Sequence, residues 1–364
     1  MSQIPSHCLV RGSINIDEFF HGKFYHYQPI HFLIFYFPTY IVNDVVRPGE
    51  TISSTKFERR AGGKGANQAA AVAQAGGRVS LVGAVGEDGK WVVNDLESMG
   101  VNVDSVSVVE GPTGRAIIQL TPAGENCIIL HRGANFALED LPDQIVSHLV
   151  SSTHILLQNE IPWSGTLAYL EHAHARGIIT IFNPSPMPPA DQIRSFPWTA
   201  LSWLLVNEVE AEGLLNSLGS QPSPSLLDGG LSTPAEWPAF PALSATYPIV
   251  KKLSSHQCLS STNVVCTIGP AGAIAIIPTL TDAIYVPAAK LQGDVRDTTG
   301  AGDCFTGYLI AGLMRLYDSG TNTLSQDNAT DLLIYSTHAA GMCVEKRGAL
   351  ESIPRRMDVD ARLG

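Results

Sequence analysis

Short apolar runs that end in polar residues recur along the chain and predict the strands of a parallel sheet. The runs, each with the polar residues that close it, are 9–17 ending at Asn15 and Asp17, 154–160 ending at Glu160, 178–183 ending at Asn183, and 201–210 ending at Asn207 and Glu210. A helical stretch at residues 166–175 lies between two of them, a rhythm typical of parallel sheets covered by helices. Ligands bind at the carboxyl ends of such strands, so these polar residues are candidates for a binding site.

Other segments predict a second, smaller sheet. Residues 51–60 alternate enough to form a strand, and residues 115–121 and 126–130 predict a hairpin that would join it. Asn15 and Asp17 would point to the same side of an extended chain and suit a polyol ligand. As an isolated pair, however, such residues more often belong to a turn.

Near the C-terminus, residues 297–307 read DTTGAGDCFTG and lie where a loop becomes a helix. Strands are predicted at 273–277 and 283–287 before it, and a helix with one apolar face follows it. Gly300 and Gly302 let the backbone approach a ligand closely, and the first amides of the helix lack intrahelical acceptors, which makes an anion hole. Asp303 in the first turn could take a hydroxyl's proton. Alternatively it only complements the helix dipole, and this loop alone does not decide between the two.

A second glycine-rich loop, residues 61–66, precedes an alanine-rich helix expected at 67–75. It is another candidate ligand site at a helix start. It is not a phosphate-binding P-loop, because Gly65 follows Lys64 where Ser or Thr would hold magnesium, and it does not fit the dinucleotide pattern G-x-G-x-x-G. By itself such a cluster is also compatible with a structural turn.

Composition narrows the class of protein. The 364 residues include 33 glycines, only 16% are charged, and the formal net charge is −11, which suits a compact α/β enzyme. An acidic chain without a basic cluster is a poor candidate for binding nucleic acid or a membrane. The six cysteines form no C-x-x-C pair, and no secretory or lipidation signal is evident. We therefore expect a soluble intracellular protein of the cytoplasm, with the nucleus as a further location.

Two segments depart from this picture. Residues 21–40 are far more aromatic than the rest and too short in their apolar part to span a bilayer. We interpret them as an insertion, and one hypothesis is the translation of an unspliced intron, since Gly22 and Lys23 can be encoded by GGTAAG, which contains a splice-donor-like GTAAG. Residues 219–247 are rich in Ser, Pro and Gly and predict a surface excursion.

Six motifs in order resemble the ribokinase-type (PfkB) sugar kinase family. The resemblance covers nearly the whole chain apart from the two unusual segments. The motifs that carry it are residues 12–17, 47–51, 62–69, 131–135, 207–210 and 297–307. The resemblance implies one α/β domain over residues 1–364, with three α/β/α layers and a small β lid. Its lid strands would come from about 14–20, 41–60 and 114–131. The lids of two subunits would pair into a homodimer, unless the insertion prevents it.

The resemblance also implies a role for each motif. Asp303 would be the general base, and the amides of Gly300, Ala301 and Gly302 would stabilise the transferring phosphoryl group. The residues that would hold the sugar hydroxyls are Asn15, Asp17, Gly63, Lys64, Asn67, Glu160 and Asp303. Those that would line the nucleotide, ATP, are Asn207, Thr267, Gly269, Gly272 and His338.

Two metal ions are implied in the same way. Mg²⁺ would accompany ATP and be held by Glu210 through water. K⁺ would be an activating ion bound largely by backbone carbonyls, at Asp297, Thr299, Cys343, Lys346, Gly348 and Ser352.

The expected activity is ATP-dependent phosphorylation of D-ribose at its 5-hydroxyl, giving D-ribose 5-phosphate and ADP. Another sugar or nucleoside kinase of this family is the near alternative. A chain that binds sugar without activity, because residues 21–40 spoil its lid, is a second alternative. A dehydrogenase is disfavoured because no dinucleotide fingerprint is present.

Overall fold

The computed structural model describes residues 5–21, 54, 56–120, 126–219, 233–234, 236–321 and 323–364. Residues 22–40 of the expected insertion, the first part of the strand expected at 51–60 and residues 220–232 of the Ser/Pro-rich excursion lie outside the described residues. The hypothesis of an unspliced intron therefore stays a prediction.

Nine strands of the described chain form the main sheet, in the order β13-β12-β11-β10-β9-β8-β1-β4-β5. Neighbouring strands from β11 to β5 pair in parallel, whereas β12 pairs antiparallel with both β11 and the edge strand β13. The strands are β1 (Cys8–Arg11), β4 (Val79–Val85), β5 (Val106–Val108), β8 (His154–Leu157), β9 (Ile179–Phe182), β10 (Trp203–Asn207), β11 (Asn263–Thr267), β12 (Ala273–Ile276) and β13 (Ile284–Val286).

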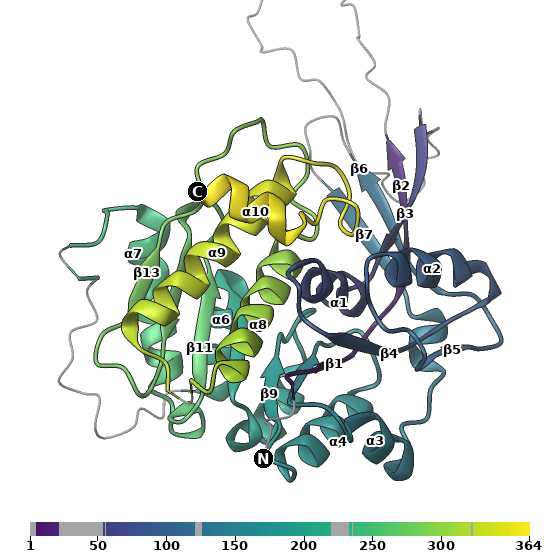
Figure 1. Ribbon diagram of the computed structural model, residues 1–364, viewed down its shortest axis with the longest axis horizontal. Coiled ribbons are helices and arrows are strands. Elements are labelled where there is room, and N and C mark those ends of the chain that lie inside the picture. Colours follow the sequence, from purple (N-terminus) through teal and green to yellow (C-terminus); the bar gives the residue numbers. More distant parts are fainter. Residues whose placement is uncertain are drawn as a thin grey trace, which may run out of the picture.

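Helices cover both faces of this sheet, which confirms the predicted three-layer α/β/α architecture (Figure 1). Side chains alternate along each strand, so Leu156 of β8 packs in one core while Ile155 and Leu157 pack in the other. On the Leu156 side lie α1 (Lys64–Gln74), α2 (Lys90–Ser98), α8 (Ala301–Asp318), α9 (Gln326–Val344) and α10 (Arg356–Leu363). On the other side lie α3 (Pro142–Leu149), α4 (Trp163–His174), α5 (Ala190–Ser195), α6 (Glu208–Leu218) and α7 (Pro241–Ser254).

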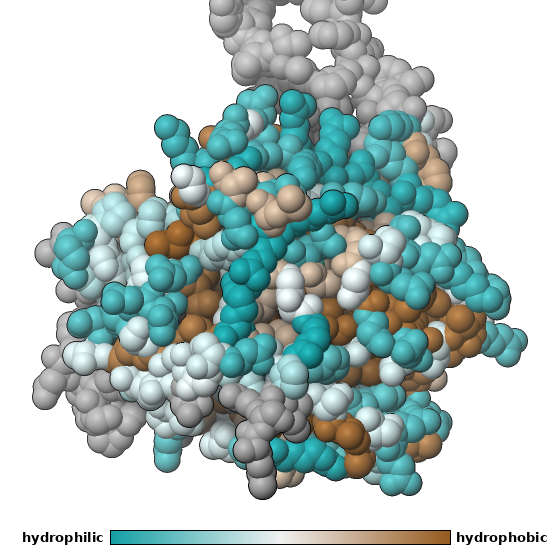
Figure 2. Space-filling model, in the orientation of Figure 1, coloured by the Kyte–Doolittle hydropathy of each residue, from teal (hydrophilic) through white to brown (hydrophobic). Residues whose placement is uncertain are grey.

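The helices turn polar surfaces outward. Hydrophilic residues cover much of the face seen in Figure 2, with hydrophobic residues in smaller patches between them. Among the helices of the described ranges, none combines the length and apolar character needed to cross a bilayer.

A four-stranded sheet stands off the main sheet (Figure 1). Its order is β3 (Lys56–Gly62), β2 (Asn15–His21), β6 (Gly114–Leu120) and β7 (Asn126–His131). The predicted hairpin is confirmed, because β6 pairs antiparallel with β7. The strand expected within residues 51–60 is described from Lys56 onward, and it pairs antiparallel with β2.

One sequence prediction was wrong in an informative way. Residues 9–17 do not form a single strand, since β1 belongs to the main sheet and β2 to the small sheet. The chain leaves the first sheet at Gly12, where a Cβ atom would lie 2.7 Å from the Cα of Gly65. It enters the second after Ile14, whose amide donates to Asn135 Oδ1 at 2.8 Å. Asn15 and Asp17 therefore lie where the two sheets meet.

One boundary also differs from the sequence analysis. Residues 241–247 belong to α7 rather than to a surface excursion. Pro241 occupies the first turn, where a missing N–H is tolerated, and Leu243 and Tyr247 are buried.

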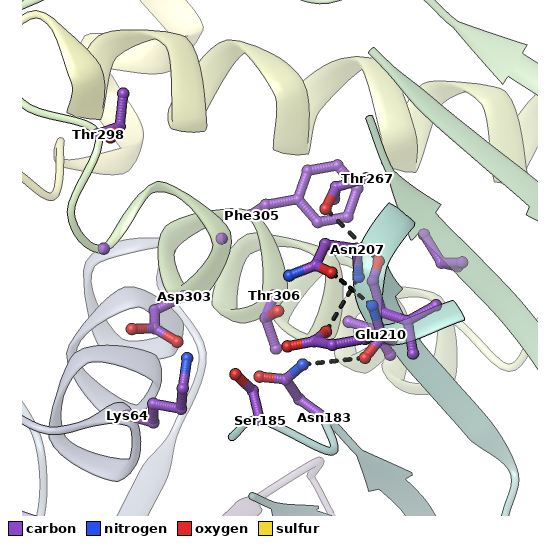
Figure 3. A pocket seen from close by; sticks show the side chains of 15 residues that line it. Lys64, Asn183, Ser185, Asn207, Glu210, Thr267, Thr298, Asp303, Phe305 and Thr306 are labelled. Carbon is purple, nitrogen blue, oxygen red and sulfur yellow. Dashed lines mark hydrogen bonds between the residues drawn. The ribbon is translucent and has the colours of Figure 1, made fainter. Parts of the chain in front are cut away.

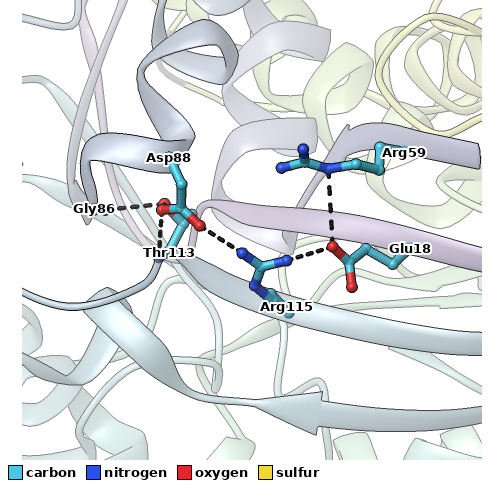
Figure 4. Close-up of polar contacts among 6 residues, drawn as sticks. All are labelled: Glu18, Arg59, Gly86, Asp88, Thr113 and Arg115. Atoms are coloured by element: carbon cyan, nitrogen blue, oxygen red, sulfur yellow. Dashed lines mark hydrogen bonds and ion pairs between the residues drawn. The ribbon is translucent and has the colours of Figure 1, made fainter.

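An ionic network joins the small sheet to the main sheet (Figure 4). Arg115 of β6 contacts Glu18 of β2 and also binds Asp88 Oδ2 at 2.6 Å, in the turn after β4. The backbone amide and hydroxyl of Thr113 donate to Asp88 Oδ1 at 2.9 and 2.7 Å. The orientation of the small sheet is thus tied to a loop of the large one.

Candidate active site

The start of α8 forms an anion hole in the part of the chain predicted to do so. Gly300 is its N-cap with φ 78°, a left-handed conformation, and a Cβ there would lie 2.9 Å from the Cα of Ala349. The space beside Gly302 is open, because a Cβ there would meet no atom within 4 Å. A ligand can therefore approach the amides of the first turn at Gly302, while the Ala301 amide donates to the Thr298 carbonyl at 3.3 Å.

Asp303 lies in that first turn and is only 7% exposed. Its Oδ2 accepts a hydrogen bond from Asn67 Nδ2 at 3.0 Å, and its Oδ1 accepts one from Gln68 Nε2 at 2.8 Å. Both donors come from α1. Hydrogen bonds from neutral amides hold the carboxylate in place while leaving lone pairs for a further proton donor.

Lys64, the first residue of α1, points its ammonium group toward Asp303 (Figure 3). Burial lowers the pKa of Lys64, but the nearby carboxylates of Asp303, Glu160 and Glu210 outweigh burial, and the pKa is raised overall. The site therefore keeps a positive charge beside the anion hole.

The other predicted sugar-binding residues gather close by. Glu160 Oε2 accepts hydrogen bonds from Ser13 Oγ at 2.6 Å and from the Lys64 amide at 3.1 Å. Asn15 Oδ1 accepts one from Asn135 Nδ2 at 2.7 Å. Residues from four separate chain segments are thus connected in one polar cluster.

Asp17, Gly63 and Asn67 complete this cluster. Asp17 is buried, and burial, with added repulsion from carboxylates such as Glu160, raises its pKa to about 7. Gly63 is the N-cap of α1 with φ 92°. Asn67 Oδ1 is buried and has no hydrogen-bond partner among the described residues, so it can accept a hydroxyl of a ligand.

Two cavities lie beside these residues. One of about 250 Å³ is lined by Lys64, Asp303 and Glu210 together with the anion-hole glycines (Figure 3). The other, of about 550 Å³, is lined by Asn15 and Glu160 together with aromatic side chains such as Trp163. Lys64 links them, because its side chain lines the first and its amide binds Glu160 in the second.

A third cavity, of about 630 Å³, lies on the other side of the anion hole and is largely apolar. Of the residues predicted to line the nucleotide, Thr267, Gly269 and Gly272 line it. His338 is not among the lining residues, although Thr337 and Gly341 beside it on α9 are, and its ring Nδ1 binds the Ile334 carbonyl at 2.8 Å. Its role at the nucleotide stays a prediction. Asn207 lines the 250 Å³ cavity.

The N-x-x-E motif also has a local structural role. The Asn207 side chain accepts the Glu210 amide at 2.8 Å, and Glu210 Oε2 accepts the Asn207 amide at 3.0 Å, a capping box that starts α6. In the described parts of the chain, no group of three or more His, Cys, Asp or Glu residues could hold a metal ion. A magnesium ion here would depend on phosphate oxygens, water and the Glu210 carboxylate, a donor set that suits it.

The six residues predicted for potassium come from the loop before α8, the end of α9 and the loop after it. Asp297 binds two of the backbone amides, with Oδ1 accepting from Thr299 at 2.9 Å and Oδ2 from Gly348 at 3.0 Å. Cys343 Sγ lies 2.8 Å from Ser352 Oγ, and its carbonyl accepts the Lys346 amide at 3.0 Å. Carboxylate and carbonyl oxygens are the donors that a hard cation prefers, so these residues fit such an ion.

Sequence reasoning gave no specific role to several residues that the structure places in the site. Gln68 and Asn135 fall within motifs whose pattern does not reveal their partners. Asn183 was named only as a polar residue that closes a predicted strand, and Gln158 closes another. Ser13, which binds Glu160, follows β1 in the same way.

A charged amine and a carboxylate lie beside an anion hole, with an apolar cavity on one side and a polar cavity on the other. This arrangement is that of a kinase that phosphorylates a small hydroxyl compound. Comparison with known proteins agrees: the model of the pfkB family carbohydrate kinases matches residues 36–356. The chain belongs to this family of phosphotransferases.

Individual relatives support the same conclusion. A ribokinase of Schizosaccharomyces pombe is 31% identical over 324 residues, covering 86% of this chain and 90% of its own. The crystal structure of a ribokinase from Cryptococcus neoformans var. grubii serotype A in complex with ADP is 44% identical, with a TM-score of 0.77 and coverage of 98% of this chain and 99% of that one. An Arabidopsis thaliana ribokinase complexed with ribose and ATP is 26% identical, with a TM-score of 0.72 and 99% coverage of both chains.

Proposed function

We propose that this chain transfers the γ-phosphoryl group of ATP to the 5-hydroxyl of D-ribose, giving D-ribose 5-phosphate and ADP. The observation that carries the proposal is the position of Asp303, which is held by two amides, lies next to the anion hole and lines the 250 Å³ cavity. The names of the similar proteins, and the ribose and ATP in one of their structures, support the choice of substrates.

In this proposal the polar cluster holds the sugar. Asn15, Asp17, Gly63, Lys64, Asn67 and Glu160 bind hydroxyls, and the unpartnered Oδ1 of Asn67 accepts one of them. Asp303 accepts the proton of the 5-hydroxyl as that oxygen attacks phosphorus.

The anion hole acts on the other reactant. Amides of Gly300, Ala301 and Gly302 donate to the phosphoryl oxygens as charge develops there, which is where most catalysis of phosphoryl transfer arises. The nucleoside part of ATP occupies the 630 Å³ apolar cavity beside Thr267, Gly269 and Gly272.

Two ions complete the proposal. Glu210 and Asn207 would hold hydrated Mg²⁺, which neutralises phosphate charge when bound. The six residues around Asp297 would hold K⁺, and this ion would fix the loop that leads into the anion hole.

A homodimer through the small sheet is also proposed. Phe57, Ile128, Ile129 and Leu130 of its strands are each about half exposed, at 50, 50, 55 and 48%. Apolar side chains at such exposure are commonly covered by a partner. The alternative is a monomer, if residues 21–40 block this face.

The proposal is tested by ADP release from ATP, Mg²⁺ and K⁺ with D-ribose, 2-deoxyribose, fructose, adenosine or no sugar. We expect release that depends on D-ribose and falls at least about a hundredfold in Asp303→Asn, the usual scale for losing a general base. The matched control is Asp327→Asn, which removes an acid from the first turn of α9. If Asp303 only complements a helix dipole, the two variants will behave alike.

Other outcomes separate the alternatives. A preference for adenosine would favour a nucleoside kinase, and ADP release that is independent of sugar would contradict the proposal. A chain that becomes active only after deletion of residues 21–40 would locate the defect in that segment and retain the family chemistry.

A further inference from the structure

A chain of buried amide side chains leads to Asp303 from the sheet. Gln68 Nε2 donates to Asp303 Oδ1 at 2.8 Å and to Asn183 Oδ1 at 3.1 Å. Gln158 Nε2, at the end of β8, donates to Gln68 Oε1 at 2.7 Å. Asn183, at the end of β9, donates in turn to the Leu205 carbonyl at 2.9 Å. The carboxylate on α8 is thus connected to three neighbouring strands through one side chain of α1.

These contacts fix which way the Gln68 amide faces. Its nitrogen has two N–H groups and both are used, while its oxygen accepts from Gln158. Rotating the amide by half a turn would place Gln68 Oε1 against Asp303 Oδ1 and its NH₂ against the Gln158 donor. Both contacts would become repulsive, so the network specifies one orientation.

Gln68 differs from its neighbour Asn67 in its access to a ligand. Gln68 is 0% exposed, so a sugar cannot reach it. Asn67 also binds Asp303 but has an unpartnered oxygen that suits a ligand, so its replacement would disturb sugar binding as well. An effect of Gln68 on the reaction must therefore pass through Asp303.

We propose that Gln68 is a positioning residue for the carboxylate of Asp303, and that Gln158 and Asn183 hold Gln68 in the orientation this requires. The inference rests on the proposed function, in which Asp303 is the base. With Oδ1 held by Gln68 and Oδ2 by Asn67, the plane of the carboxylate is set and a remaining lone pair can face the acceptor hydroxyl. Orientation of this kind affects the rate of transfer more than it affects sugar binding.

The test is Gln68→Met, which keeps the length of the side chain and removes its hydrogen bonds. We expect kcat with D-ribose to fall about ten- to a hundredfold, the scale of losing a hydrogen bond to a charged group, while KM for the sugar changes less than about threefold. The control is Gln74→Met on the same helix, whose Nε2 binds the Met99 carbonyl at 2.8 Å far from the site. It should leave both constants near those of the unaltered protein.

A double-mutant cycle distinguishes positioning from a general structural role. If Gln68 acts through Asp303, adding Gln68→Met to Asp303→Asn should cause less than about a twofold further loss. Equal losses in both backgrounds, or a rise in KM that matches the fall in kcat, would overturn the inference. If Gln68→Met does not fold, Gln158→Met gives a second test, since it removes the hydrogen bond that holds Gln68 Oε1, and an unchanged kcat there would equally overturn the inference.

The two proposals fail in different ways. No sugar-dependent ADP release by the unaltered chain would reject the proposed function itself. An active chain whose Gln68→Met and Gln158→Met variants keep full kcat would reject only the positioning role.

Discussion

The carboxyl of Asp17 is only partly ionised near neutral pH. Burial raises its pKa to about 7, and the carboxylates of Glu160, Glu351 and Asp303 add to the effect. Lys64 lies close to two of the same carboxylates and keeps its charge for the same reason. The sugar cluster therefore contains one group that titrates within the physiological range.

This titration predicts a pH dependence of sugar binding. An ionised carboxylate accepts hydrogen bonds from sugar hydroxyls better than a protonated one, so affinity should be lost as pH falls through about 7. For a group with this pKa, the Kd for D-ribose should rise by roughly thirtyfold between pH 8 and pH 5.5. Calorimetric titration without ATP measures it. Asp17→Asn should bind more weakly at pH 8 and lose the dependence, whereas a flat profile in the unaltered chain would show that another group governs binding.

At the residue scale, the sequence predicted which residues could bind or react better than it predicted their hydrogen-bond partners. The Asp303 motif and the residues of the sugar cluster were found because their loops and strand ends have recognisable patterns. Gln68 was not singled out, because a glutamine inside an alanine-rich helix has no pattern that reveals its partners. His338 shows another limit: Thr337 and Gly341 beside it on α9 line the apolar cavity, but the sequence does not give the direction of its ring, and its role stays a prediction.

At the scale of elements, the base of the small sheet packs into the main core through Ile16 and Ala61, and a few polar contacts are added there. Arg115 reaches from β6 to Asp88 and to Glu18, and its own side chain is about a quarter exposed, at 26% (Figure 4). Contacts at this exposure contribute little stability, on the order of 1 kcal/mol or less. They can still orient one sheet against the other, because Thr113 fixes the carboxylate that Arg115 binds.

Arg115→Met should therefore loosen the small sheet without unfolding the protein. We expect KM for D-ribose to rise several-fold and the slow hydrolysis of ATP without sugar to increase, because a sheet that is poorly held excludes water less well. Hydrogen exchange of the amides in β2 and β6 should accelerate. Arg59→Met is the control, since that side chain makes only a 3.8 Å contact with Glu18. If hydrogen exchange, the KM for D-ribose and ATP hydrolysis are all unchanged in Arg115→Met, other contacts must orient the small sheet.

The elements that were predicted correctly have strong local patterns. The strands β8, β9, β10, β12 and β13 and the hairpin of β6 and β7 follow from apolar runs and turn residues. The pattern of residues did not reveal the division between β1 and β2, although the family resemblance implied a lid strand at about 14–20. The division depends on Gly12 packing against Gly65, more than fifty residues later in the sequence. The helix α10 is short and mostly exposed, so its sequence carries little periodicity.

For the whole molecule, strand order places the site. From β1 the sheet proceeds through β4 and β5 in one direction and through β8 to β13 in the other. Ligands bind where the order reverses, outside the carboxyl ends of the strands. Here the reversal lies between β1 and β8, and the residues that follow them meet directly, with Ser13 Oγ donating to Glu160 Oε2 at 2.6 Å. The strand β2 of the small sheet begins at the same point, which places Asn15 and Asp17 beside the proposed sugar site.

The central claim is that Asp303 directs phosphate onto the 5-hydroxyl of ribose, and the position of the phosphate tests it most directly. The 364-residue chain would be incubated with ATP, Mg²⁺, K⁺ and D-ribose, and the product examined by ¹H–³¹P correlation NMR. The account predicts a phosphorus coupled to the protons on carbon 5, and no phosphorylated product from 5-deoxyribose. A phosphorus coupled to the anomeric proton, or ADP formed with inorganic phosphate alone, would contradict it.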